Sequence, residues 1–156
     1  MDTNVVKETE DNIFNYLCRY SRFIKKSEKY IRLVIDCGYL YFENNHILPL
    51  FQACKYSGST STENTVKMIL DVISRTSLED ILNYKNDEGL TSLMIGSKYL
   101  NNGSSEDTIL MLLNAGADIN IKNKDKKAYD YLENKVFFCF YPPKNTIDYK
   151  LLYQEE

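Results

Sequence analysis

Two stretches decide the fold: NDEGLTSL at residues 86–93 and ILMLLNAGADIN at residues 109–120. In the first stretch Gly89 suits a turn, and the hydroxyl of Thr91 can cap a following helix. In the second stretch apolar residues recur at three- and four-residue spacing, which places them on one face of a helix. Gly116 is placed to end that helix in a left-handed conformation. The order predicted for this segment is turn, helix, loop, helix and turn.

The same order recurs 43 positions earlier in the chain, which identifies an internal repeat. Pro49 fits the first turn of the earlier copy's first helix, where a missing N–H costs nothing. Glu63 and Glu106 open the two second helices, where the helix dipole favours a carboxylate. The aligned pairs are Leu50 with Leu93, Lys55 with Lys98, Tyr56 with Tyr99, Val66 with Ile109, Ile69 with Leu112 and Leu70 with Leu113.

Fainter copies precede and follow these two. A helix is expected from Glu10, and a second from Ser27, whose side chain can cap it, with a stop at Gly38. A fourth start lies at residues 125–134, and a closing helix over residues 145–153 is expected to cover the last copy. The aromatic cluster at 137–141 is expected to form a lid over the core, with a docking patch as the alternative.

These motifs resemble the ankyrin repeat, whose pattern runs G-x-T-P-L-H-x-A and then V-x-x-L-L-x-x-G-A-D-x-N. The resemblance implies an all-α, ankyrin-like repeat solenoid of about four helix-turn-helix units with atypical terminal caps. The expected repeats of this single domain are residues 10–42, 43–85, 86–122 and 123–156. Ser92 replaces the family proline, and Phe51 and Met94 replace the family histidine, so the turn bonds must be supplied by other groups.

Composition predicts a cytoplasmic protein. The formal net charge of −3 argues against a nucleic-acid partner. The four cysteines show no CxxC pair, which favours reduced thiols in the core. No apolar run is long enough to cross a bilayer, so no membrane partner is expected. The abundant Asn, Lys, Ile and Tyr and the polar interhelical loops resemble ankyrin proteins of Mimivirus-type giant viruses, for which the compartment would be the host cytoplasm.

Three motifs suggest a chemical role, and each has a simpler alternative. Asp118-x-Asn120 suggests a calcium loop, but Lys122 occupies the next ligand position, so a turn is favoured. The run after Gly58 suggests a phosphate cradle but has no following GK[ST], so a flexible loop is favoured. A nucleophile formed by Cys54 and His46 would define a small enzyme, although a packed Cys54 is favoured. No catalytic, cofactor or metal site is therefore predicted.

The function implied by the resemblance is recognition of a protein partner, a host protein if the chain is viral, through a concave surface of inner helices and loop tips. The chain is expected to be a non-enzymatic monomer, with a self-assembling structural protein as the alternative. Tyrosines are expected to act as the large anchors. The predicted contact residues are Gln52, Lys55, Tyr56, Ile95, Lys98 and Tyr99 on the inner helices, and Tyr84, Asn86, Asp87, Glu88, Lys122 and Lys124 at the loop tips.

Overall fold

The computed structural model describes residues 13–37, 48–75 and 79–132, and within these ranges the regular structure is helical. The expected helix at 145–153, the cluster at 137–141, Gly38 and His46 lie outside the described residues. The elements in order are α1 (Ile13–Arg19), α2 (Ser27–Asp36), α3 (Leu48–Tyr56), α4 (Glu63–Arg75), α5 (Glu79–Leu82), α6 (Ser92–Lys98), α7 (Glu106–Asn114) and the 3-10 helix η2 (Ala128–Leu132).

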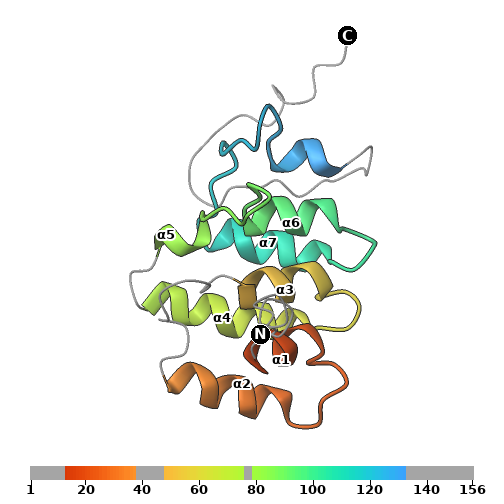
Figure 1. The fold of residues 1–156 in the computed structure, drawn as a ribbon, viewed down its shortest axis with the longest axis vertical. Coiled ribbons are helices and arrows are strands. Elements are labelled where there is room, and N and C mark those ends of the chain that lie inside the picture. The colour runs from red at the N-terminus through yellow and green to blue at the C-terminus, as the bar shows by residue number, and fades with distance from the viewer. Residues whose placement is uncertain (1–12, 38–47, 76–78, 133–156) are drawn as a thin grey trace, which may run out of the picture.

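The helices are stacked in pairs that form two layers (Figure 1). In each pair the first helix packs against the second: α1 against α2, α3 against α4, and α6 against α7. The first helices also contact one another in the order α1, α3, α6 and η2, and the second helices do so in the order α2, α4 and α7. The expectation of an all-α fold built from helix pairs is confirmed.

Apolar side chains from both layers fill the space between them. Phe14, Ile31, Leu50, Ile69 and Leu112 are each at most 1% exposed. Burying a side chain of this size stabilises a fold by about 1.5–3 kcal/mol. The core is therefore continuous from α1 to η2, and each pair contributes to it.

Helix α6 occupies the centre of the stack. It is only seven residues long, yet residues 92–97 are all buried, because α3, α7 and η2 cover it on three sides. Thr91 caps it by accepting a hydrogen bond from the Met94 N–H at 3.3 Å, as predicted. Gly116 ends α7 with a φ of 96°, also as predicted.

Helix α2 begins at Ser27, but the predicted cap is wrong. The residue before the helix is Lys26, in the left-handed conformation with a φ of 63° and without a side-chain cap bond. The Ser27 hydroxyl instead donates to the carbonyl of Ser21 at 2.7 Å. The serine thus secures the preceding loop and not the free N–H groups of its own helix.

Side chains of asparagine supply the turn bonds that the missing histidine leaves open. The Asn86 side-chain oxygen accepts from the N–H groups of Glu88 and Leu90. The Asn123 amide donates to the Glu88 carbonyl, and the Asn83 oxygen accepts from the Asp118 N–H. Each of these last two bonds joins the turn that follows α5 to the turn that follows α7.

Candidate functional site: a cation–tyrosine column and its groove

A basic residue followed by tyrosine stands at the end of each first helix. The pairs are Arg19-Tyr20 at the end of α1, Lys55-Tyr56 at the end of α3 and Lys98-Tyr99 at the end of α6. Because the first helices pack side by side, the three pairs meet on one surface. We call these six residues the cation–tyrosine column.

Cations and rings alternate along this column. The Arg19 guanidinium carbon lies 5.2 Å from the ring centre of Tyr20 and 4.6 Å from that of Tyr56. The Lys55 amine lies 5.2 Å from the Tyr56 ring centre and 4.5 Å from that of Tyr99, and the Lys98 amine lies 5.5 Å from that of Tyr99. All five distances fall within the range of a cation–π interaction, worth about 0.5–1 kcal/mol at an exposed site.

Lys55 has the most perturbed environment of the column's cations. Desolvation lowers the pKa of its amine, but hydrogen bonds to Tyr99 and Tyr56 outweigh that effect, so the net pKa is raised from its ordinary value of 10.5. The amine therefore stays charged at physiological pH. A fixed positive charge between two rings is a contact point for a hydrogen-bond acceptor or a carboxylate.

A groove of about 200 Å³ adjoins the column. Phe51, Leu90 and Ile95 form its apolar lining, and each is at most 6% exposed. The Gln52 side-chain oxygen is buried and has no hydrogen-bond partner among the described residues. The complete lining is Phe51, Gln52, Lys55, Asn86, Glu88, Leu90, Ile95 and Tyr99.

Six of the twelve predicted contact residues line this groove: Gln52, Lys55, Asn86, Glu88, Ile95 and Tyr99. Lys98 joins them through an ion pair with Glu88 at 3.5 Å, and Tyr56 joins through its contact with Lys55. The structure therefore brings together the inner-helix residues and part of one turn.

The remaining four predicted residues lie on the turns, outside the groove lining. Tyr84, which is 57% exposed, and Asp87 are on the turn after α5; Lys122 and Lys124 are exposed on the turn after α7. The Lys85 amine donates to the Lys122 carbonyl at 2.7 Å and so ties the two turns together.

The prediction that Ile95 is an exposed contact residue is wrong, because its side chain is only 5% exposed. Its position in α6 is covered by the neighbouring helices, so it serves as part of the groove wall. Arg19 and Tyr20 were not predicted at all. Their recurrence is visible in the sequence, but the spacing from the first pair to the second is 36 residues, and from the second to the third 43.

The Cys54 thiol does not fit a nucleophilic role. Its side chain is fully buried in α3, and this burial raises its pKa far above the ordinary value of 9.0. A nucleophilic cysteine acts as the thiolate, which burial in apolar surroundings disfavours. The other member of the hypothesis, His46, lies outside the described residues.

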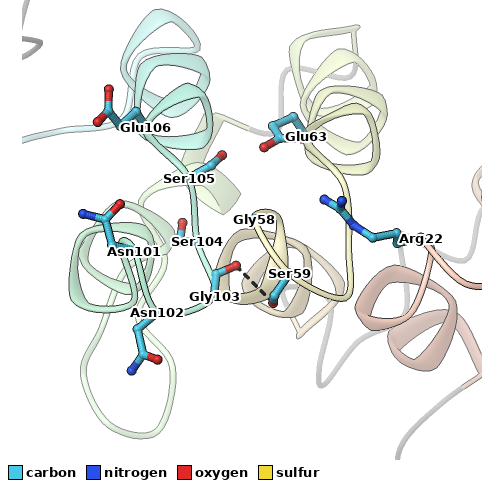
Figure 2. A pocket seen from close by; sticks show the side chains of 10 residues that line it. All are labelled: Arg22, Gly58, Ser59, Glu63, Asn101, Asn102, Gly103, Ser104, Ser105 and Glu106. Carbon is cyan, nitrogen blue, oxygen red and sulfur yellow. Dashed lines mark hydrogen bonds between the residues drawn. The ribbon is translucent and has the colours of Figure 1, made fainter.

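A larger, open hollow of about 640 Å³ lies over the two interhelical loops (Figure 2). The Gly58 N–H donates to the Gly103 carbonyl at 2.8 Å, and the Ser59 hydroxyl donates to the same carbonyl at 3.3 Å. Glu63 and Glu106 line the hollow at the starts of α4 and α7, where they disfavour an anion such as phosphate. The loop expected to be flexible is therefore fixed to its neighbour by hydrogen bonds.

Buried hydroxyls also join neighbouring helix pairs. The Thr65 hydroxyl of α4 donates to the Ser21 hydroxyl at 2.8 Å, and the Thr108 hydroxyl of α7 donates to the Ser57 hydroxyl at 2.6 Å. Both threonines are completely buried. We call these two bonds the hydroxyl links. They stand at corresponding positions of successive pairs, so the stacking geometry repeats.

Successive helix pairs, packed in two layers and joined by repeated polar links, define an all-α repeat protein. One comparison with known proteins supports this class. The chain is 33% identical over 92 residues, 55% of its length, to an ankyrin repeat protein of Acanthamoeba polyphaga mimivirus. This match supports an ankyrin-repeat relationship and a viral relative, as the motifs predicted.

The matched part of this chain spans only 14% of that relative's length. No family model matches the sequence. No solved structure matches it. Within the described ranges, none of the helices combines the length and apolarity needed to cross a membrane.

Proposed function

We propose that the chain is a protein-interaction module that binds a protein partner through the cation–tyrosine column and the adjoining groove. The observation that carries this proposal is the alternation of fixed cations and tyrosine rings across three successive first helices. The ankyrin-repeat relationship supports the same class of function.

The column is suited to binding because its side chains are already held in place. Ordering a flexible side chain at an interface costs about 0.5–1.5 kcal/mol, and the cation–π contacts reduce that cost before a partner arrives. Tyrosine and arginine are also the residue types enriched at interface positions that dominate binding energy. The expected anchors are therefore Tyr56 and Tyr99, with Tyr20 beside them.

The groove offers a complementary kind of contact. Its apolar wall can bury an aliphatic or aromatic side chain of the partner, while the Gln52 oxygen can accept a hydrogen bond that the described residues do not supply. A buried acceptor without a partner costs about 1–3 kcal/mol, so a donor from the partner would recover that loss.

The test is a binding measurement on partners captured from host-cell lysate with the tagged chain. Tyr56→Ala with Tyr99→Ala is expected to weaken the binding of each captured partner at least tenfold, because truncating an anchor side chain typically costs about 2 kcal/mol or more of binding free energy. The matched control is Tyr129→Ala, an exposed tyrosine on η2 that is 53% exposed and outside the groove lining.

Retention of every partner by the folded double variant at unchanged affinity would show that this surface is not the binding site. Circular dichroism of the double variant provides the folding control.

Two alternatives are separated by further measurements. For a self-assembling structural protein, sedimentation would show species whose mass increases with protein concentration. We propose instead that the chain sediments as a monomer at every concentration. For an enzyme that uses Cys54, replacing this residue with alanine would abolish activity, whereas the proposed binding would persist. We place the module in the cytoplasm, that of the host if the protein is viral.

A further inference from the structure

The α1–α2 end of the stack differs from the rest of the molecule in charge. Residues 13–37 contain six basic and two acidic residues, although the whole chain carries a net charge of −3. Lys25, Lys26 and Lys29 are all exposed on the loop before α2 and its first turn. Figure 1 shows α2 at the end of the stack farthest from η2.

Large apolar side chains are exposed at the same end. Phe23 is 71% exposed, Leu33 58% and Tyr30 45%. These exposed fractions are high for side chains of this size, and the three residues share one loop and the outward side of one helix with the lysines. We call Phe23, Lys25, Lys26, Lys29, Tyr30 and Leu33 the end patch.

The loop that carries Phe23 is held firmly, so its exposure is built into the fold. The Ser27 hydroxyl donates to the Ser21 carbonyl, and the Phe23 N–H donates to the Tyr20 carbonyl at 3.0 Å. The Arg22 guanidinium donates to the carbonyls of Ser57 and Ser61 in the neighbouring loop. Arg22 is therefore occupied within the fold, while the three lysines of the end patch form no ion pair among the described residues.

Comparison of the helix pairs argues against another stacked pair on this patch. Aligning Ile31 with Val66 places Tyr30 at the position of Thr65 and Leu33 at that of Met68. Thr65 is completely buried and hydrogen-bonded to the preceding pair, which requires a small hydroxyl side chain. The larger Tyr30 would prevent the same close approach of a further pair or of a second copy.

We propose that the end patch binds the surface of an anionic phospholipid membrane. A helix face that combines lysines with exposed aromatic and aliphatic residues is the arrangement that lies in a membrane interface. Phe23 and Leu33 would enter the acyl boundary, and the three lysines would contact headgroup phosphates. Interfacial binding requires no spanning helix, so the finding that no described helix can cross a membrane does not oppose this.

The lipid surface fits these residues better than an acidic protein does. Phe23 lies on the loop before α2 and Leu33 lies within α2, and no residue of the end patch lines either of the two hollows described above. A protein partner would have to supply a separate pocket for each projecting side chain, whereas a fluid interface accepts them without a preformed shape.

The test is co-sedimentation of the full chain with vesicles of phosphatidylcholine alone, and with vesicles containing phosphatidylcholine and phosphatidylserine in about a two-to-one ratio. Binding is expected only to the mixed vesicles and should weaken at high salt. Lys25→Gln with Lys29→Gln should reduce binding about 25-fold, since each cation near an anionic surface contributes about fivefold. Phe23→Ser with Leu33→Ser should reduce it at least tenfold.

The matched control is Lys67→Gln with Arg75→Gln, which removes two exposed cations from α4. It is expected to retain binding. Failure of the wild-type chain to bind mixed vesicles, equal binding to neutral vesicles, or equal loss in the control would each overturn the proposal. Capture of an acidic protein through the end patch, without vesicle binding, would assign the patch to a protein instead.

Discussion

Thr108 shows how a single hydroxyl joins two helix pairs. It donates to the Ser57 hydroxyl of the preceding pair and lies 3.1 Å from the hydroxyl of Ser105, which caps α7. Thr108→Val keeps the shape but removes both contacts. The expected cost is about 1–2 kcal/mol in the free energy of unfolding, measured by urea denaturation.

Ser74→Ala is the matched control, because its hydroxyl bond to the Asp71 carbonyl is exposed and local. It should change the free energy of unfolding by less than about 0.5 kcal/mol. If both variants lose the same stability, the hydroxyl links do not stabilise the stack.

The cysteines predict a pattern of chemical reactivity. Burial raises the pKa of the Cys18 and Cys54 thiols, whereas Cys37 is exposed. Iodoacetamide should therefore label Cys37 in the folded chain and leave Cys18 and Cys54 unlabelled until the protein unfolds, as read by mass spectrometry of peptides. Rapid native labelling of Cys54 would contradict the buried position.

The same two thiols predict a pH dependence of stability. In the unfolded chain they ionise near their ordinary pKa of 9.0, whereas in the folded chain they stay protonated to higher pH. The contribution of these two thiols to the free energy of unfolding is fully present below about pH 9 and is lost as the pH rises above that value. Replacing both with alanine should flatten this part of the stability profile measured by denaturation.

At the scale of elements, the two interhelical loops act as one unit. A Cβ added to Gly58 would lie 2.7 Å from the Ser104 carbonyl oxygen, which belongs to the backbone and cannot turn aside. Gly58→Ala should therefore separate the loops and cost about 2 kcal/mol in the free energy of unfolding.

Gly96→Ala is the comparison, since its Cβ would meet only side chains, at 3.6 Å or more. It should be nearly neutral, because alanine also favours the helix that surrounds it. Equal destabilisation by both variants would show that loop contact is not the cause.

Local signals account for the elements that the sequence predicted correctly. The Thr91 cap, the Gly116 stop and the acidic starts of α4 and α7 each depend on neighbours within one turn. The role predicted for Ser27 is wrong because its hydroxyl donates to the carbonyl of Ser21, six residues away. The exposure predicted for Ile95 is wrong because three other elements cover α6. These outcomes depend on tertiary packing, which periodicity does not contain.

The candidate site was predicted in part for a related reason. Lys55-Tyr56 and Lys98-Tyr99 were found because their copies align at one fixed shift. Arg19-Tyr20 follows a different spacing, and its contact with Tyr56 exists only once α1 lies beside α3. The groove likewise requires a turn and two helices to meet.

At the scale of the whole molecule, each helix pair is stabilised by its neighbours, and stability is expected to vary along the stack. Helices α3, α4 and α6 have neighbours on both sides within their layer, whereas α2 and α7 lie at the two ends of the second layer and α5 is short. Hydrogen exchange should therefore be slowest in α3, α4 and α6 and faster in α2, α5, α7 and η2, as measured by mass spectrometry. Uniform exchange would indicate that the stack opens as a single unit.

The hydroxyl links give the array a direction of growth. A threonine on each later pair reaches back to a serine on the pair before it, so a duplicated copy fits only if it carries both residues. The third copy has Leu100 where the first two have Ser21 and Ser57, and therefore offers no hydroxyl to a following threonine. An array lengthened during evolution, or by an engineer, would be extended most readily by inserting copies of residues 48–90 ahead of Thr91, and least readily by adding them after α7.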